Sequence, residues 1–267
     1  MIERDATIGL DPQQRQPPQA AHLPAGRAQV TATAAAFGAL HRDRAPGEPL
    51  VLPGPWDAAA ARVFEEAGFP ALATPSAGVA ASLGYADGAV PPREMFEAVA
   101  RVARAVSVPV SADVEDGYGL PARQLVGRLW DAGVVGCNLE DSTDGRLKDP
   151  REQAEYLAAV REAAGRELFV NARVDTYVRG VADLEETVAR ARLYVEAGAD
   201  CVYVIMAPVE VLPALRERVD APLNAICVPG GPSPTELGKL GASRVTFGPG
   251  LQRRAMEALR EIAAGLG

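Results

Sequence analysis

The fold of this 267-residue chain is indicated most directly by residues 131–141, Asp131-Ala132-Gly133-Val134-Val135-Gly136-Cys137-Asn138-Leu139-Glu140-Asp141. The stretch ends a helical pattern at Gly133, continues as a short apolar run and finishes on two acidic residues. Glycine just after a helix supplies the left-handed turn that stops it. Charged residues directly after a buried strand are typical of α/β proteins, whose sites lie at the carboxyl ends of parallel strands.

The same passage from helix through glycine to strand recurs on either side of this stretch. Glu66-Ala67-Gly68 and Glu196-Ala197-Gly198 repeat it, and each glycine is 65 residues from the next. Two strand–helix units of about 30 residues fit that interval. The repeat favours a closed barrel, because a barrel is quasi-symmetric about its axis.

Short apolar runs alternate with amphipathic stretches along most of the chain, which predicts parallel βαβ units. A (β/α)8 TIM barrel typically needs about 250 residues, so the length fits one such domain. Alternation alone leaves a doubly wound sheet open. The expected strands are 49–53, 71–75, 108–113, 136–141, 168–175, 201–206, 222–228 and 244–248. The expected helices are 30–42, 57–67, 93–106, 121–132, 150–164, 184–197 and 251–264.

The domain organisation follows from composition. Residues 1–29 are rich in Gln, Pro, Ala and Arg and lack the apolar core of a signal peptide, so we expect a flexible tail. Residues 30–267 are expected to form one barrel domain. The three cysteines, Cys137, Cys201 and Cys227, are widely spaced in apolar runs, which indicates core residues rather than a disulfide framework.

Net charge excludes some classes of partner. The chain carries a formal charge of −8, so neither nucleic acid nor an anionic membrane would meet a basic surface. The sequence contains no run of about 20 apolar residues, so no transmembrane helix is expected. We therefore expect a cytoplasmic protein that acts on a small molecule.

Three neighbouring strands present polar side chains on one face where each strand ends, because residues two apart share a face. Burying several carboxylates together is prohibitive without a cation or shared protons, and oxygen ligands suit Mg²⁺. Arg173 adds a fork for a carboxylate or phosphate-like group. The alternative is an ion-pair network that pins the barrel mouth. The residues are Asp113 and Glu115, then Asn138 and Glu140, then Asn171, Arg173 and Asp175.

Missing residue types narrow the chemistry further. The histidines, His22 and His41, precede the first strand, and neither lysine, Lys148 or Lys239, is placed on a barrel strand. A histidine-rich zinc site, a Ser-His-Asp triad and a Schiff-base lysine are therefore disfavoured. Metal-assisted polarisation of a carbonyl remains.

From about residue 35 to its end, the chain resembles the isocitrate lyase/phosphoenolpyruvate mutase superfamily. Five motifs occur in the family's order, whereas a single Gly-Tyr-Gly would be a weak signal. They are Pro55-Trp56-Asp57-Ala58-Ala59-Ala60-Ala61-Arg62, Gly84-Tyr85-Ala86-Asp87-Gly88, Asp113-Val114-Glu115-Asp116-Gly117-Tyr118-Gly119, Leu139-Glu140-Asp141-Ser142 and Asn171-Ala172-Arg173-Val174-Asp175.

The resemblance implies an enzyme that acts on 2-oxo acids or their precursors through a Mg²⁺-stabilised enolate, with Mn²⁺ as a substitute. It implies that Asp113, Glu115 and Glu140 form the metal site, some of them through water. Members commonly exchange a terminal helix, which implies a homo-oligomer, dimer or tetramer, with residues 251–267 packed on their own barrel or on a neighbour's.

The other implied site residues bind or face the substrate. Asp87 matches the acidic residue near the reacting group, and Arg173 matches the arginine that grips the substrate. Ser76 and Ala77 match a turn whose backbone N–H groups hold the substrate carboxylate. Tyr85 lies nearby without an implied role.

Departures from the family pattern bear on the reaction. The loop 142–149 lacks the cysteine of the C–C lyases and the longer gating signature of the phosphonate enzymes. Pro75 replaces a substrate-contacting serine, and Ile205 replaces a histidine of the mutases. The pattern resembles most a short-loop subgroup that includes an oxaloacetate decarboxylase-like branch.

The sequence thus favours a Mg²⁺-dependent lyase of a small 2-oxo acid, by C–C cleavage or decarboxylation of an oxaloacetate-like compound. One alternative is P–C bond mutase or hydrolase chemistry on phosphonopyruvate-like substrates. Another is a phosphate-binding barrel built on the turns 228–231 and 247–250. A third is a non-catalytic metabolite-binding barrel, against which the retained carboxylates argue.

Overall fold

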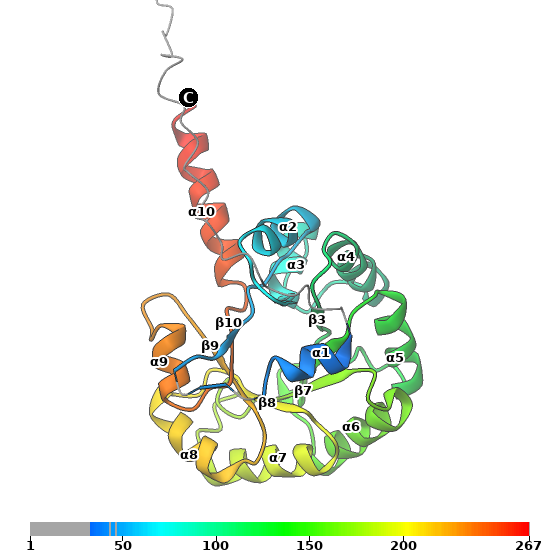
Figure 1. The fold of residues 1–267 in the computed structure, drawn as a ribbon. Coiled ribbons are helices and arrows are strands. Elements are labelled where there is room, and N and C mark those ends of the chain that lie inside the picture. The colour runs from blue at the N-terminus through cyan, green and yellow to red at the C-terminus, as the bar shows by residue number, and fades with distance from the viewer. Residues whose placement is uncertain (1–32, 43, 46, 267) are drawn as a thin grey trace, which may run out of the picture.

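The computed structural model describes residues 33–42, 44–45 and 47–266, so the expected tail 1–29 lies outside the described residues. Eight strands form a ring surrounded by helices (Figure 1). Each of the eight expected strands is confirmed, with slightly tighter ends. The strands are β1 Leu50–Val51, β2 Leu72–Ala73, β3 Val110–Asp113, β4 Gly136–Leu139, β7 Phe169–Val174, β8 Cys201–Val204, β9 Leu223–Ile226 and β10 Arg244–Thr246.

The strands close into a (β/α)8 barrel. Their order around the sheet is β1-β10-β9-β8-β7-β4-β3-β2, and every pair is parallel. The first and last strands of that order meet where the amide of Ala73 donates to the carbonyl of Pro53, at 3.2 Å. This closure rules out the doubly wound alternative.

Helices cover the outside of the ring, and the glycine signal behaves as expected. Gly68, Gly133 and Gly198 have φ of 85°, 77° and 101°, so each adopts the left-handed turn after a helix. The helices are α1 Ala34–Ala39, α2 Ala58–Glu66, α3 Ser76–Leu83, α4 Pro92–Arg104, α5 Ala122–Asp131, α6 Pro150–Ala164, α7 Leu184–Glu196, the 3₁₀ turn Val209–Val211, α8 Leu212–Arg218, α9 Pro234–Lys239 and α10 Gly250–Ala264.

Helix α1 closes the amino-terminal end of the barrel. Its Phe37 packs edge-on against Phe169 at the start of β7, and His41 stacks on the same ring at 4.2 Å. Burial lowers the pKa of His41 to about 3, so this imidazole is neutral. The amino-terminal end of the barrel is therefore lined by aromatic rings where it meets α1, with the Arg244 guanidinium 5.9 Å from the Phe37 ring.

Helix α3 and a short hairpin were not expected from the sequence, and neither were the 3₁₀ turn and helices α8 and α9. The residues of α3 are small and mostly apolar on all sides, so no helical period appears, although Pro75 before it and Gly84 after it are helix boundary signals. A hairpin also follows β4, formed by β5 Ser142–Thr143 and β6 Arg146–Leu147. Its two turn residues, Asp144-Gly145, have positive φ, a known hairpin signature.

Helix α10 points away from the ring (Figure 1). Only Gln252 of its residues is buried, whereas Leu259 and Ile262 are 54% and 61% exposed. Within the described part of the chain, none of the helices has the length and apolarity to cross a membrane.

Candidate active site

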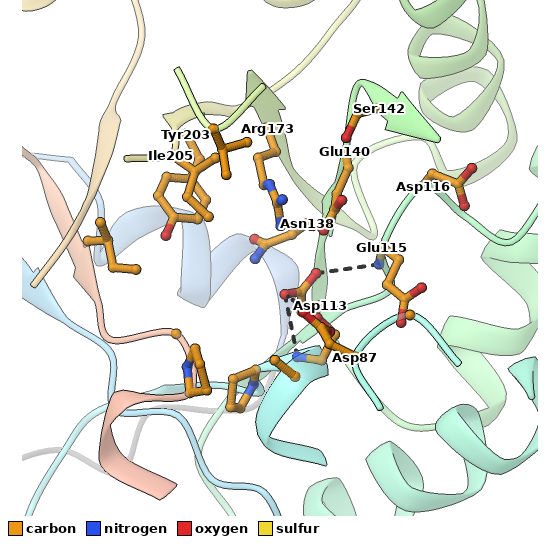
Figure 2. Close-up of a pocket in the computed structure, with 18 of the residues that line it drawn as sticks. Asp87, Asp113, Glu115, Asp116, Asn138, Glu140, Ser142, Arg173, Tyr203 and Ile205 are labelled. Carbon is orange, nitrogen blue, oxygen red and sulfur yellow. Dashed lines mark hydrogen bonds and ion pairs between the residues drawn. The ribbon is translucent and has the colours of Figure 1, made fainter. Parts of the chain in front are cut away.

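A polar pocket of about 650 Å³ opens at the carboxyl ends of the strands, a size usual for small-molecule sites. Figure 2 shows Arg173 and Glu140 entering it from one side, and Asp113 and Asp87 from the other. Of the residues that the sequence singled out for the site, Asn171 and Asp175 are fully buried and do not line the pocket. Those that line it are Ser76, Ala77, Asp87, Asp113, Glu115, Asn138, Glu140 and Arg173.

Asp113 ends β3 inside a set of donors. The hydroxyl of Ser76 donates to Asp113 Oδ2 at 3.0 Å, and the amides of Ser76 and Glu115 approach its two oxygens at 3.4 Å. Burial nevertheless raises the pKa of Asp113, and Arg173 opposes that rise. Ser76 therefore donates its hydrogen bonds to Asp113. Ala77 lines the pocket in the first turn of α3, where backbone N–H groups have no partner within the helix.

Glu115 lies in the turn after β3 with an incompletely satisfied carboxylate. Its φ is 52°, a left-handed value that a glutamate rarely adopts, and Tyr118 shares that conformation at 57°. Neither Glu115 Oε1 nor the Tyr118 hydroxyl has a hydrogen-bond partner among the described residues, although both atoms are buried. Burial, followed by the charges of Asp113 and Asp87, raises the pKa of Glu115 to about 7.

Arg173 connects two carboxylates at the end of β7. Its Nη1 contacts Glu140, while Nε and Nη2 donate to the oxygens of Asp175 at 2.6 and 3.2 Å. Two of its five N–H groups remain for a ligand. Burial is the largest influence on Glu140 and raises its pKa; the Arg173 guanidinium lowers it, and the charges of Asp113, Asp175 and Glu115 raise it further.

The next residue along β4, Asp141, points out of the barrel into a saturated network. It accepts from the amide of Asp175 at 2.8 Å, from Tyr194 at 2.8 Å and from Arg190 at 3.2 Å. Ion pairs of the kind considered as the alternative occur in both places: Arg190 pairs with Asp141 outside the barrel, and Arg173 pairs with Glu140 and Asp175 at the pocket.

The hairpin β5–β6 forms one rim of the pocket. Thr143 contacts Asp116, Ser142 contacts Asp175, and Arg179 donates to the Ser142 hydroxyl at 3.0 Å. Figure 2 shows Asp116 and Ser142 on this side.

Several lining residues had no role assigned from the sequence. Alternation along β8 places Tyr203 beside Ile205 on the inward face, which the sequence could have indicated. Arg179 follows β7 in a loop and carried no such signal. These lining residues are Asp116, Tyr118, Arg179 and Tyr203.

Cys137 does not line the pocket. It is fully buried, and burial raises the pKa of its thiol to about 12. The pocket therefore lacks a cysteine nucleophile among its lining residues, as the sequence of the loop after β4 indicated.

The donor set of the pocket fits Mg²⁺. Among the described residues, no three His, Cys, Asp or Glu side chains form a ready-made cluster for one ion. Mg²⁺ is usually held by one or two carboxylates, with water and substrate completing the shell. The unpartnered oxygen of Glu115 and the raised pKa values of three acids are what a cation in this pocket would relieve.

Comparison with known proteins identifies the family. The family model for phosphoenolpyruvate phosphomutase matches residues 37–266. An uncharacterized Mycobacterium tuberculosis protein is 39% identical over 215 residues, covering 79% of this chain and 81% of its own. A Corynebacterium glutamicum protein named "Probable 2-methylisocitrate lyase 2" is 32% identical over 216 residues, covering 75% and 67%.

Solved structures agree with this result. The 2,3-dimethylmalate lyase superposes with a TM-score of 0.77 at 28% identity, over 89% of this chain and 88% of its own. Oxaloacetate acetylhydrolase bound to 3,3-difluorooxalacetate gives a TM-score of 0.80 at 25% identity, over 90% and 87%. With the barrel, the motifs and these matches, the chain belongs to the phosphoenolpyruvate mutase/isocitrate lyase superfamily, whose members are lyases and mutases.

Proposed function

We propose that this enzyme is a Mg²⁺-dependent lyase of a small 2-oxo dicarboxylate, acting by decarboxylation or C–C cleavage on an oxaloacetate-like compound. The observation that carries the proposal is a pocket in which acidic strand ends converge opposite Arg173, with a second guanidinium, Arg179, at its rim. Two cationic groups suit a substrate with two carboxylates. The resemblance to an enzyme bound to 3,3-difluorooxalacetate supports the same substrate class.

The residues have distinct tasks in this proposal. Asp113, Glu115 and Glu140 hold the metal, in part through water. Bound Mg²⁺ supplies a Lewis acid that polarises the 2-oxo group. Arg173 binds the adjoining carboxylate with its two unused N–H groups, and Ala77 adds a backbone donor at the start of α3.

Proton movement and bond choice follow from the lining residues. Without metal, burial and the charges of Asp113 and Asp87 raise the pKa of Glu115 to about 7, and bound Mg²⁺ would lower it again and keep the carboxylate ionised. Asp87 lies beside the reacting group. Because no cysteine lines the pocket, loss of CO₂ is favoured over the cysteine-dependent cleavage of isocitrate-like substrates.

The test is a screen of 2-oxo mono- and dicarboxylates with Mg²⁺ or Mn²⁺, comparing wild type with Asp113→Ala. We expect turnover of a dicarboxylate by wild type and a loss of at least about 100-fold in Asp113→Ala. Asp131→Ala, at an exposed position on α5, is the matched control. If wild type and Asp113→Ala are equally inert towards every 2-oxo dicarboxylate, the proposal fails.

P–C bond chemistry is the second candidate, because the matching family model describes a phosphomutase. Incubation with phosphonopyruvate and observation of the ³¹P NMR signal would decide it. A new phosphate or phosphate-ester resonance that depends on Asp113 would favour this reaction over decarboxylation.

We also propose that α10 packs on a second copy of the chain. Its apolar stripe, including Leu259 and Ile262, has no covering surface within the described residues. Light scattering after gel filtration should show a dimer or tetramer in wild type and a smaller species in Leu259→Glu. Ala264→Glu adds the same charge to the opposite face of α10 and should leave the mass unchanged; equal behaviour of both variants would contradict the proposal.

A further inference from the structure

A buried cation lies beneath the pocket without a carboxylate partner. Arg244 of β10 is fully buried inside the barrel, and its Nε and Nη1 have no hydrogen-bond partner among the described residues. Its Nη2 donates to Asn138 Oδ1 at 3.4 Å, and its guanidinium lies 5.9 Å from the ring of Phe37. Burying an arginine with so few partners is unfavourable for stability alone.

The contact with Arg244 fixes the polarity of the Asn138 amide. Asn138 Oδ1 also accepts from Asn171 Nδ2 at 2.7 Å. An amide side chain can flip, and Asn171 would tolerate either orientation by flipping as well. Arginine has donors only, so a flipped Asn138 would present its NH₂ group to a guanidinium. Arg244 therefore keeps the Asn138 amide oxygen pointing towards its own guanidinium and the NH₂ group pointing away from it.

That NH₂ group belongs to the pocket. Asn138 lines the pocket, and its Nδ2 donates to no acceptor among the described residues. In the sheet register Asn138 lies beside Asp113 of β3 and beside Asn171 of β7, one step below Arg173. Figure 2 shows it between Arg173 and Asp113, at the centre of the site.

We propose that Asn138 is a substrate-binding residue whose Nδ2–H donates to a ligand oxygen, and that Arg244 is the positioning residue that aims it. The inference rests on the proposed function, since the ligand oxygen belongs to a 2-oxo acid or its enolate. A neutral N–H donor stabilises the negative charge on the enolate oxygen, and it adds no net charge to the pocket. Arg244 thus contributes to ligand binding through Asn138, without touching the ligand itself.

The direct test measures oxalate binding in the presence of Mg²⁺ by calorimetry. We expect Asn138→Leu, which keeps the side-chain size and removes the donor, to bind oxalate about 10- to 100-fold more weakly than wild type. Asn224→Leu is the matched control, because Asn224 is a buried barrel amide that bonds to Thr246 and does not line the pocket. It should bind oxalate like wild type.

The role of Arg244 is tested by a double-mutant cycle. Arg244→Met should weaken oxalate binding in the wild-type background, and Arg244→Lys, which keeps a donor, should restore part of it. In Asn138→Leu, Arg244→Met should have no further effect, an outcome that a merely structural role would not produce. Melting curves show which variants are folded, and Arg244→Met should melt no lower than wild type.

The outcomes separate this inference from the proposed function. Tight oxalate binding by wild type with unchanged binding in Asn138→Leu overturns the inference alone. An equal loss from Arg244→Met in both backgrounds overturns the positioning role. If wild type with Mg²⁺ fails to bind oxalate, the proposed function fails and the inference fails with it.

Discussion

Glu140 and Asp141 are consecutive acids with opposite surroundings. Glu140 faces the pocket among other carboxylates, with Arg173 as its counter-charge. Asp141 faces the shell between barrel and α7, where Arg190, Tyr194 and a backbone amide satisfy it. Burial raises the pKa of both, so burial does not distinguish them.

The difference lies in how completely the surroundings compensate each charge. The Asp141 network has matched donors for its acceptors, as a stabilising device requires. The pocket contains more acids than cations and leaves an oxygen of Glu115 unpartnered. An excess of carboxylates over cationic groups is tolerated where a metal ion and a substrate bind. The uncompensated negative charge therefore marks the side of the strand end that carries the function.

Glu140→Gln is expected to have the largest effect on activity. Because the amide keeps the shape and removes the charge, we expect kcat/KM to fall by about 100- to 1,000-fold. The unfolding free energy should stay level or rise, since the neighbouring carboxylates Asp113, Asp175 and Glu115 also disfavour the charge. Steady-state kinetics and urea unfolding measure the two effects, and a large loss of stability would place Glu140 with Asp141.

Asp141→Asn should show the reverse behaviour. Breaking a buried ion pair by removing one charge lowers the unfolding free energy by about 3–5 kcal/mol. Thermal and urea unfolding measure that loss, while kcat per folded molecule stays near the wild-type value. Asp131→Asn at the exposed end of α5 is the control; equal destabilisation in both would contradict the network's importance.

The pH dependence of stability tests the pocket in its metal-free form. Glu115 has a usual pKa of 4.5 and a folded pKa of about 7, so the folded protein binds more protons than the unfolded chain between these values. The unfolding free energy should therefore decline as pH rises through this window, on the order of 1 kcal/mol after solvent screening.

Two additions sharpen that measurement. Saturating Mg²⁺ should remove the decline, because a cation favours the ionised carboxylate. Glu115→Gln should make the metal-free decline shallower, and the raised pKa of Glu140 should leave part of it in place. A metal-free stability that climbs between pH 4.5 and 7 would contradict the assigned environment of Glu115.

The smallest expected effect is that of Tyr194→Phe. It removes the hydrogen bond that Tyr194 donates to Asp141 and the one it accepts from Arg190 at 3.3 Å, but leaves the Arg190–Asp141 pair in place, so the unfolding free energy should fall by about 1 kcal/mol. Chemical denaturation measures this, and turnover should not change. A measurable loss of kcat would link the outer network to the pocket.

The sequence predicted what depends on local pattern. Apolar runs gave all eight strands, glycine gave the helix ends, and alternation along a strand placed Asp113 and Glu140 in one pocket. Side-chain partners depend on how distant strands are staggered once the barrel closes. Arg244 and Asn138 are 106 residues apart in the sequence, so their contact could not be predicted. Arg179 reaches the rim of the pocket from a loop, so its place there could not be predicted either. Helix α3 was missed because small residues carry no amphipathic period.

The aromatic closure by α1 affects the kinetics of release. Phe37, His41 and Phe169 fill the amino-terminal end, and the pocket opens at the other end, where the β5–β6 hairpin forms one rim. In the proposed decarboxylation, the carboxylate bound by Arg179 would lie at this rim, and the fragment held by the metal ligands would lie deeper. We therefore expect CO₂ to depart first and the remaining 2-oxo acid to behave as a competitive product inhibitor.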